Sequence, residues 1–437
     1  MARLLYRLLL ALLVPALITR LFWRARKQPE YLQHLGERLG RYAIRSQRPV
    51  LWLHAVSVGE TRAAEPLIKL LVDRHPDHQL LITCMTPTGR ATAESLYLNV
   101  ATIVYLPYDF AFAQRRFFRH WQPTLGVLME TELWPNLLFE AHQAEVPLAL
   151  VNARLSERSA RGYTRFAALS RPALATLTAV AAQSTADAER LAAVGAPSPV
   201  VCGNLKFDVT PAANLIQLGR QWRAAALSVA GRPRLIWLAA STREGEENLV
   251  LDAFARLSGR HENTLLVLVP RHPQRFDEVA SLANSRGLKL QRRSVGPAAD
   301  DTQVWLGDSM GEMAAYFAMA DCCVMGGSLL PYGSQNLIEA CACGCPVLVG
   351  PSDFNFRQAV ADAIAAGAAW RIGPDVPAIT AALDDLRRNP EQLVRCRAAA
   401  LDFTTKHQGA TQKTQAVLDG LLERARKQKS VTARATN

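Results

Sequence analysis

The sequence lacks an uncharged run long enough to cross a membrane as one straight helix. Arg7 and Arg20 leave twelve uncharged residues between them, whereas the hydrocarbon core of a bilayer needs about 20. No small-residue cleavage site follows, because residues 22–27 are bulky and basic, which argues against a cleaved signal peptide. A spanning anchor would need both arginines to snorkel. A helix lying in the membrane interface fits residues 4–23 most simply.

Acidic residues are scarce at both ends of the chain, and this scarcity accounts for the whole net charge of +12. Residues 1–48 carry ten Lys and Arg against two Glu, and residues 423–437 carry five against one. The body between them is electrically neutral. A nucleic-acid-binding protein instead spreads Lys, Arg and aromatic residues over a folded face. Basic ends beside an apolar segment indicate a membrane that holds anionic lipids, with the body of the chain on the cytoplasmic side, rather than a nucleic acid.

Histidine is absent around the most cysteine-rich stretch, which holds Cys341, Cys343 and Cys345. Alternate spacing near the end of a predicted helix does not bring three thiolates together easily. We therefore expect buried small residues here rather than a metal site. The eight cysteines of the chain agree with a reducing compartment.

Apolar runs alternate with amphipathic stretches along most of the chain, which is typical of parallel sheets covered by helices on both faces. A chain of 437 residues is too long for one ordinary core and suits two domains of roughly 200 residues each. We expect an α/β protein with two Rossmann-like, doubly wound domains facing a cleft. The predicted parts are a membrane anchor at 1–30, a first domain at 31–208, a linker at 209–232, a second domain at 233–422 and a basic tail at 423–437.

The strands of these domains are predicted from short apolar runs bounded by polar or glycine-containing segments. In the first domain they are expected at 50–54, 80–83, 102–106, 125–129, 148–151, 180–182 and 200–202. In the second domain they are expected at 235–239, 265–269, 304–306, 322–325 and 347–349.

A glutamate stands where the helix after the first predicted strand begins. Gly59 allows a tight turn, and Glu60 follows it directly. Open α/β sheets bind ligands at the carboxyl ends of their strands, so Glu60 is the leading candidate for a catalytic base. Acidic residues are also common in the first turn of a helix because they complement its dipole, and that structural role stays open for Glu60.

Loops rich in glycine and polar residues follow several strands of the second domain. Gly326, Gly327 and Gly333 would let backbone amides approach an anion, and Arg271 offers a forked donor to a phosphate. Glu339, one turn into the following helix, would accept hydrogen bonds from ribose hydroxyls. These residues predict a nucleotide site, although glycine loops are often only turns and Glu339 can serve the helix dipole alone.

Nine longer motifs extend this interpretation. They are HAVSVGE (54–60), MTPTGR (85–90), METELWPN (129–136), NARLS (152–156), GNLKFD (203–208), STREGEE (241–247), VPRHPQRF (269–276), GDSMGEM (307–313) and GGSLLPYGSQNLIEA (326–340). In this order they resemble the bacterial 3-deoxy-D-manno-octulosonic acid (Kdo) transferases of lipid A biosynthesis. The resemblance runs from the hydrophobic N-terminus to about residue 355.

The resemblance implies a glycosyltransferase of the GT-B type, anchored at the cytoplasmic face of the inner membrane. Such an enzyme takes Kdo from CMP-Kdo and attaches it to the 6′-hydroxyl of the tetraacyl lipid A precursor, lipid IVA. It inverts the anomeric carbon and uses neither a metal nor another cofactor. The resemblance places the proton acceptor on Glu60. It places the CMP contacts on Pro270, Arg271, Met310, Gly311, Glu312, Asn336, Leu337, Ile338 and Glu339.

One position departs from the family pattern. Many members read Gly-Gly-His-Asn where this chain reads Gly333-Ser334-Gln335-Asn336. Gln335 can donate a hydrogen bond but carries no charge, so we expect an altered donor affinity rather than a lost reaction. Two rival interpretations stay open. One is a two-domain transferase or epimerase that uses a UDP-sugar, and the other is a membrane-associated protein that binds an anionic lipid without turning it over.

Overall fold

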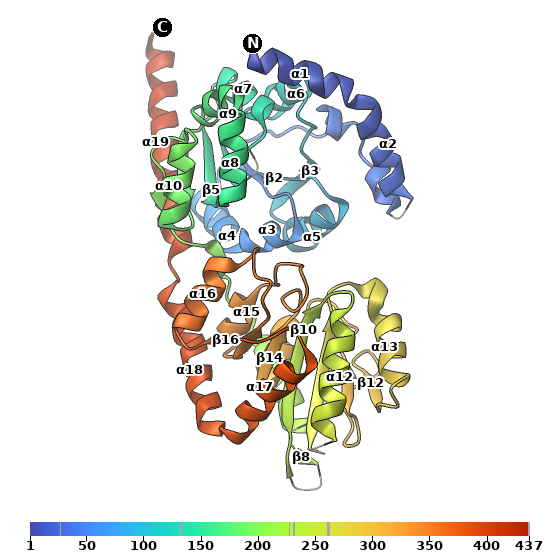
Figure 1. Ribbon diagram of the computed structural model, residues 1–437. Helices are drawn as coiled ribbons and strands as arrows, with labels where there is room; N and C mark the ends of the chain where they lie inside the picture. Colours follow the sequence, from blue (N-terminus) through green and yellow to red (C-terminus); the bar gives the residue numbers. More distant parts are fainter. Residues whose placement is uncertain (27, 132, 227, 230–231, 260–262, 436–437) are drawn as a thin grey trace. The chain divides into compact units, whose positions relative to one another are not determined.

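The computed structural model describes residues 1–26, 28–131, 133–226, 228–229, 232–259 and 263–435. The chain forms two compact units, the first made of Met1–Val209 with Gln408–Asn437 and the second of Thr210–His407. Each unit contains a seven-stranded sheet covered by helices (Figure 1). The two units confirm the prediction of an α/β protein with two parallel-sheet domains.

The sheet of the first unit has the strand order β3-β2-β1-β4-β5-β6-β7, and every pair is parallel. Strand β1 lies inside this sheet and contributes to two cores, because Leu51 and Leu53 face one side and Val50 and Trp52 the other. Gly126 on the neighbouring strand leaves room for the Trp52 indole, since a Cβ there would lie 2.7 Å from Trp52 Cε3. The strands are β1 (Val50–His54), β2 (Gln79–Cys84), β3 (Ala101–Tyr105), β4 (Pro123–Met129), β5 (Leu148–Ala153), β6 (Ala179–Ala182) and β7 (Val200–Val201).

Helices cover both faces of this sheet. Phe117, Trp121 and Leu138 belong to one core, and Leu67, Ala93 and Leu422 belong to the other. The helices are α1 (Ala2–Leu12), α2 (Val14–Ala25), α3 (Val58–Ala63), α4 (Glu65–Arg74), α5 (Pro87–Tyr97), α6 (Ala111–Trp121), α7 (Pro135–Gln143), α8 (Glu157–Arg165), α9 (Ala167–Leu174), α10 (Thr185–Ala193) and α19 (Ala410–Ala435), with short 3-10 turns at η1 (Pro29–Leu32), η2 (Glu37–Leu39) and η3 (Leu205–Asp208).

The sheet of the second unit is also parallel, with the order β12-β13-β11-β10-β14-β15-β16. Strand order reverses between β10 and β14, which is where open sheets of this kind form a ligand crevice at their carboxyl edge. The strands are β10 (Leu235–Thr242), β11 (Thr264–Pro270), β12 (Leu290–Arg292), β13 (Val304–Leu306), β14 (Cys322–Met325), β15 (Val347–Val349) and β16 (Ala369–Arg371), beside a separate antiparallel pair of β8 (Ser228–Val229) and β9 (Arg232–Pro233). The helices are α11 (Ala213–Ala226), α12 (Glu246–Ser258), α13 (Phe276–Asn284), α14 (Met313–Met319), α15 (Leu337–Ala342), α16 (Arg357–Ala365), α17 (Val376–Arg388) and α18 (Pro390–Lys406), with a 3-10 turn at η4 (Pro273–Arg275).

The segment predicted as a linker, residues 209–232, is largely a helix of the second unit. Helix α11 spans 14 residues. Its Trp222 packs edge-on against Trp305, with ring centroids 5.1 Å apart, and the Arg223 guanidinium donates to Asp321 at 2.7 Å. The prediction failed because it relied on the absence of a strand, and a helix packed beside a sheet carries no strand pattern.

The predicted end of the second domain, residue 422, also differs from the structure. The chain returns to the first unit after His407, and Leu418 and Leu422 of α19 are buried in the first unit's core. Asp208 caps the start of this helix, because its carboxylate accepts the Gly409 N–H at 2.7 Å and the Thr411 N–H at 2.5 Å. The predicted basic tail at 423–437 is therefore not a separate part, since α19 extends to Ala435.

Gly219 on α11 provides a test of the corrected boundary. A Cβ at Gly219 would lie 2.2 Å from the Ala315 carbonyl oxygen on α14, so Gly219→Ala should cost about 1–3 kcal/mol through overpacking. The helical glycine of α8, Gly162, has no atom within 4 Å of such a Cβ, and Gly162→Ala should be neutral or stabilising. Thermal unfolding of both variants checks this difference. Equal melting temperatures would show that α11 does not pack on the second unit.

Candidate functional site

Glu60 lies in the first turn of α3, at the carboxyl edge of the first sheet. Ser57 is the N-cap of this helix, and its Oγ accepts the Glu60 N–H at 3.4 Å. In return, the Glu60 carboxylate accepts the Val56 N–H at 2.8 Å and the Ser57 hydroxyl at 2.9 Å. This reciprocal arrangement resembles a capping box and orients a carboxylate that is only 9% exposed. Glu60 therefore has a structural role in capping α3. The same hydrogen bonds hold its carboxylate in a fixed position at the end of β1.

The loop after β2 lies against the turn that carries Glu60. The Thr86 hydroxyl donates to the Val56 carbonyl oxygen at 3.3 Å and caps α5 through the Gly89 N–H at 3.1 Å. Gly89 has to be glycine for this approach, because a Cβ there would lie 2.9 Å from the Val56 carbonyl oxygen. Two of the sequence motifs, at 54–60 and 85–90, thus form one packed surface around Glu60.

A second buried acid, Glu130, follows β4 at the same edge. Its backbone has a φ of 57°, which few residues other than glycine adopt without cost. Lys206 Nζ lies 2.9 Å from one of its carboxylate oxygens and Arg154 Nε lies 3.1 Å from the other. Burial alone would raise the pKa of Glu130, but these two cations hold the pKa below its usual range. Glu130 is thus held ionised in a salt-bridge network, whereas Glu132 lies outside the described residues.

His54 belongs to the same motif as Glu60 but has a different environment. It is fully buried, and burial lowers the pKa of its imidazole to about 4. Its Nδ1 lies 2.9 Å from Thr83 Oγ1, which also accepts the Trp52 indole N–H at 2.8 Å. His54 is therefore neutral at physiological pH and part of the sheet's internal polar network.

In the second unit, arginines gather around the ends of β10 and β11. The backbone N–H of Arg271 donates to the Thr242 carbonyl oxygen at 3.0 Å, and this hydrogen bond joins the ends of the two strands. Partial burial together with Arg243, Arg271 and Arg275 lowers the pKa of His272. Arg275 is neutralised by Glu247, with Nη1 and Oε1 2.6 Å apart. Pro270 and Arg271, two of the residues predicted to contact CMP, thus lie in a region of positive charge.

The predicted contact residues after β13 precede helix α14. Met310 is 62% exposed, and Gly311 has a φ of 83° with open space around it. Glu312 accepts the Ser309 hydroxyl and pairs with Arg293 at 2.9 Å. Its carboxylate is therefore already engaged within the second unit, so a ligand contact by this segment falls most readily to its backbone and to Met310.

The glycine-rich loop after β14 packs closely on the end of β10. A Cβ at Gly326 would lie 2.2 Å from the Ser241 carbonyl oxygen, so only glycine fits this position. Ser334 has a φ of 68° and donates its N–H to the Gly327 carbonyl oxygen at 2.7 Å. Gln335, which stands where many family members have histidine, has its amide nitrogen 3.2 Å from the place of a Gly327 Cβ. Its side chain therefore packs on the loop.

Glu246, a residue that the sequence did not single out, organises this loop. Its side chain is fully buried and accepts four backbone N–H groups, one from Arg243 at 2.9 Å and three from the loop, of Gly327 at 2.6 Å, Leu329 at 3.0 Å and Leu330 at 3.3 Å. Burial raises the pKa of Glu246. In the sequence, Glu246 cannot be distinguished from an ordinary surface glutamate. Only its place in the 241–247 motif could have indicated its role.

The last four residues predicted to contact the CMP donor lie at the start of helix α15. Asn336 is the N-cap, and its Oδ1 accepts the Ile338 N–H at 3.2 Å. Leu337 and Ile338 are buried, whereas Asn336 and Glu339 are partly exposed. Side-chain contacts to a ligand are therefore open to Asn336 and Glu339 only. All nine predicted donor residues lie at the carboxyl edge of the second sheet, and Glu60 lies in the first unit.

The cysteines behave as small core residues. Cys341 and Cys345 are buried and Cys343 is partly buried, and all three are reduced. Burial raises the pKa of the Cys341 and Cys343 thiols. Within the described part of the chain, no group of three metal-ligating side chains includes a cysteine.

Helix α1 turns three polar residues toward the first unit, and both N-terminal helices expose apolar side chains. Arg3 and Arg7 reach the buried Glu140 carboxylate of α7 at 2.6 and 2.7 Å, and the Tyr6 hydroxyl donates to Asp109 at 2.8 Å. Burial raises the pKa of Asp109 to about 6. The exposed apolar side chains are Leu4, Leu5, Leu8, Leu9, Leu12, Leu13, Leu17, Ile18, Phe22 and Trp23.

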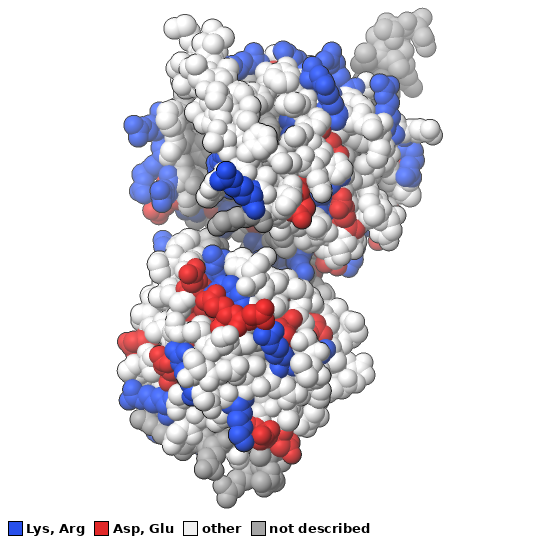
Figure 2. All heavy atoms as spheres, turned by 90° about the vertical axis from the view of Figure 1, so that its right-hand side faces the viewer, with Lys and Arg blue, Asp and Glu red and all other residues white. Residues whose placement is uncertain are grey.

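Seen from the side that bears α1 and α2, the first unit has broad uncharged areas bordered by Lys and Arg (Figure 2). No single helix in the described segments is both long and apolar enough to cross a bilayer, while α1 and α2 together reach that length and composition but are bent by 49°. The salt bridges of Arg3 and Arg7 explain why basic residues interrupt this apolar segment: they hold α1 on the protein.

Comparison with known proteins gives a consistent assignment. Residues 33–209 match the family described as 3-deoxy-D-manno-octulosonic-acid transferase, and residues 220–403 match the glycosyl transferases group 1. A 3-deoxy-D-manno-octulosonic acid transferase of Bordetella pertussis is 42% identical over 97% of this chain and 100% of its own length. One of Haemophilus influenzae is 33% identical over 97% of this chain and 100% of its own length.

A solved structure supports the fold. A putative UDP-N-acetylglucosamine 2-epimerase from Listeria monocytogenes covers 86% of this chain and 97% of its own, with a TM-score of 0.59 and 15% identity. The likeness confirms a GT-B-like arrangement of elements, and at this identity it concerns the fold alone. The sequence relatives decide the family: the chain belongs to the 3-deoxy-D-manno-octulosonic acid transferases, which are glycosyltransferases.

Proposed function

We propose that this Kdo transferase takes Kdo from CMP-Kdo and attaches it to the 6′-hydroxyl of lipid IVA in lipopolysaccharide biosynthesis. The observation that carries the proposal is the Glu60 carboxylate, which Val56 and Ser57 fix at the carboxyl end of β1. It lies in a chain that matches a Kdo transferase over 97% of its length. The donor, the acceptor and the stereochemistry belong to the proposal, and the sugar follows from the family.

In the proposed mechanism, Glu60 acts as the general base. The acceptor hydroxyl oxygen attacks the anomeric carbon of Kdo from the side opposite to the phosphate, and its proton passes to a Glu60 carboxylate oxygen. The new C–O bond forms as the bond between the anomeric carbon and the phosphate oxygen breaks, so CMP leaves and the anomeric configuration inverts. General base catalysis of this kind contributes about 100- to 10,000-fold to a rate.

The charge that develops on departing CMP calls for fixed positive groups. Arg271 and Arg243 stand at neighbouring strand ends of the second unit, and preorganised cations stabilise a leaving phosphate without the need for a metal ion. Asn336 and Glu339 are placed to accept or donate hydrogen bonds to the nucleoside, with Met310 beside Gly311 as an apolar contact. On these grounds we propose a reaction that is independent of metals and other cofactors.

The outward apolar face of α1 and α2 supports attachment to the inner membrane at its cytoplasmic face. Leu5, Leu8 and Leu12 are 59%, 54% and 77% exposed, and a bilayer would bury them at about 25 cal/mol per Å². The basic residues that follow, such as Arg24 and Arg26, would meet anionic headgroups. The membrane also holds the proposed acceptor, whose acyl chains are insoluble in water.

Replacing Glu60 tests the proposed base. Glu60→Gln should lower kcat for Kdo transfer to lipid IVA by about 100- to 10,000-fold, because an amide cannot accept the proton. Glu65→Gln on α4, which removes a surface pair with Lys69 of 2.7 Å, is the matched control and should retain activity. Product formation is measured by mass spectrometry together with the melting temperature of each variant. A Glu60→Gln variant as active as the wild type would assign the base to another residue.

Arg271 tests the donor site. Arg271→Gln should weaken binding of CMP by about 10- to 100-fold, which is the usual loss for a charge-assisted hydrogen bond. Arg286→Gln removes an arginine that pairs with Asp252 at 2.9 Å on the surface of the second unit and should leave affinity unchanged. Isothermal titration with CMP and then with UDP provides the measurement. Preference for UDP would favour the UDP-sugar transferase or epimerase over the proposed donor.

The exposed leucines test the membrane proposal. A variant with Leu8→Gln and Leu12→Gln should bind vesicles of mixed anionic and zwitterionic phospholipid at least about tenfold more weakly, because less apolar surface is buried. The control, Val394→Gln with Leu401→Gln, alters side chains of α18 that are 67% and 48% exposed. Co-sedimentation with the vesicles measures the partition. Equal binding of both variants would place the membrane contact elsewhere.

A further inference from the structure

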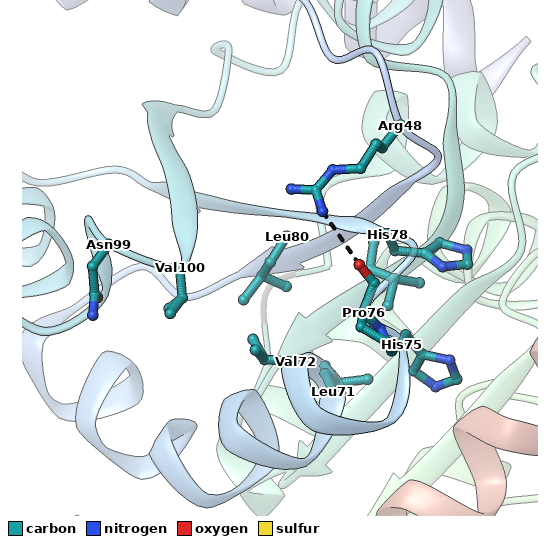
Figure 3. Close-up of a pocket in the computed structure, with 10 residues that line it drawn as sticks. Arg48, Leu71, Val72, His75, Pro76, His78, Leu80, Asn99 and Val100 are labelled. Carbon is teal, nitrogen blue, oxygen red and sulfur yellow. Dashed lines mark hydrogen bonds between the residues drawn. The ribbon is translucent and has the colours of Figure 1, made fainter.

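A cluster of histidine and aspartate side chains lies at the turn between α4 and β2. His75, Asp77 and His78 each offer one ligand atom, and these atoms all lie within 4.8 Å of one another. Across the described segments of the chain, no other such group of three is found. Figure 3 shows the rings of His75 and His78 side by side, turned away from the apolar side chains of Leu80 and Val100. Both histidines line the pocket next to these side chains, and their rings lie at its edge.

The cluster is close to the geometry of a tetrahedral metal site. His78 Nδ1 and Asp77 Oδ1 are 2.9 Å apart, and the two imidazole centroids are 5.8 Å apart. In a zinc site with bonds of about 2.0–2.1 Å, neighbouring ligand atoms are roughly 3.3 Å apart. The His75 and His78 side chains are 11% and 5% exposed, so their backbone and rotamers are already constrained.

A carboxylate of helix α19 contacts the cluster at one ring. Asp419 Oδ1 lies 3.5 Å from His75 Nε2, while the ligand atoms that are mutually close among the described residues are those of His75, Asp77 and His78. Asp419 also pairs with Arg74 at 2.9 Å and accepts the Gln415 amide at 2.8 Å, which orients its carboxylate toward His75. Two imidazoles and one carboxylate are a ligand set suited to zinc or to cobalt and nickel, rather than to magnesium or calcium.

We propose that His75, Asp77 and His78 bind one divalent transition-metal ion of the zinc type at the turn between α4 and β2, and that Asp419, which contacts the His75 ring, fastens α19 to this site. The ion would be structural. It lies at the amino edge of the sheet, because Gln79 pairs with Val50 at the start of β1, whereas Glu60 follows the other end of that strand. The five residues of β1 separate the two edges by roughly 16 Å. The site is thus independent of the proposed reaction.

Titration of the untagged full-length protein with Zn²⁺ and Co²⁺ tests the site. One equivalent should bind, and the cobalt complex should absorb as a tetrahedral ion without sulfur-to-cobalt charge transfer, because its ligands are nitrogen and oxygen. His78→Gln should weaken binding by at least about 100-fold. His142→Gln, which changes an exposed histidine of α7, should bind as the wild type does. No binding by the wild type, equal binding by His78→Gln, or sulfur charge transfer would overturn the proposal.

Hydrogen exchange tests the fastening of α19. Zinc should slow amide exchange in residues 410–425 of the wild type, and the same addition should change nothing in Asp419→Asn. Arg74→Gln removes the ion pair with Asp419 but leaves the three ligands and the Asp419 carboxylate in place, so its response to zinc should persist. The comparison is made with and without metal in each variant, which separates loss of the site from general destabilisation. Slowing that survives in Asp419→Asn would overturn the role of Asp419.

Discussion

The parallel direction of the strands is the constraint on which both units depend. Parallel pairing requires a crossover after each strand, so helices cover both faces and every strand delivers its carboxyl end to the same edge. Glu60, Glu130 and Arg154 are thereby brought to one edge of the first sheet, and Arg271, Gly311 and Gly326 to one edge of the second. The amino edges of the sheets hold none of the predicted site residues, and the histidine cluster beside β2 lies at such an edge.

Buried parallel strands were the most predictable part of the fold. The run 50–54 was predicted and found as β1 with the same bounds, and the same holds for β13, β14 and β15, because strands buried on both faces read as continuous apolar runs. Strands β12 and β16 were missed. Each has only three residues, LQR in β12 and AWR in β16. Both strands lie at the edges of the sheet, where polar and charged residues are tolerated, so they do not form an apolar run in the sequence.

The candidate site was predictable where a motif carried it and not where burial decided it. Glu60 and Arg271 lie in the segments that follow apolar runs, and this position is visible in the sequence. The role of Glu246 could not be predicted in this way, because a glutamate whose buried carboxylate accepts four backbone N–H groups looks the same in the sequence as a solvated glutamate. In the same way, Arg3 and Arg7 read as interruptions of an apolar helix, although they are paired with a buried glutamate.

The cap that Asp208 gives to α19 has a consequence for the order in which the protein is made. The two partners are separated by about 200 residues of sequence, all of them in the second unit. When a ribosome has released the first seven strands, the helix that completes their second covering layer has not yet been synthesised. The groove for Leu418 and Leu422 then stays open to water until translation of the second unit is complete. Because domains generally fold as units during synthesis, the second unit can finish folding before the first, although it comes later in the chain.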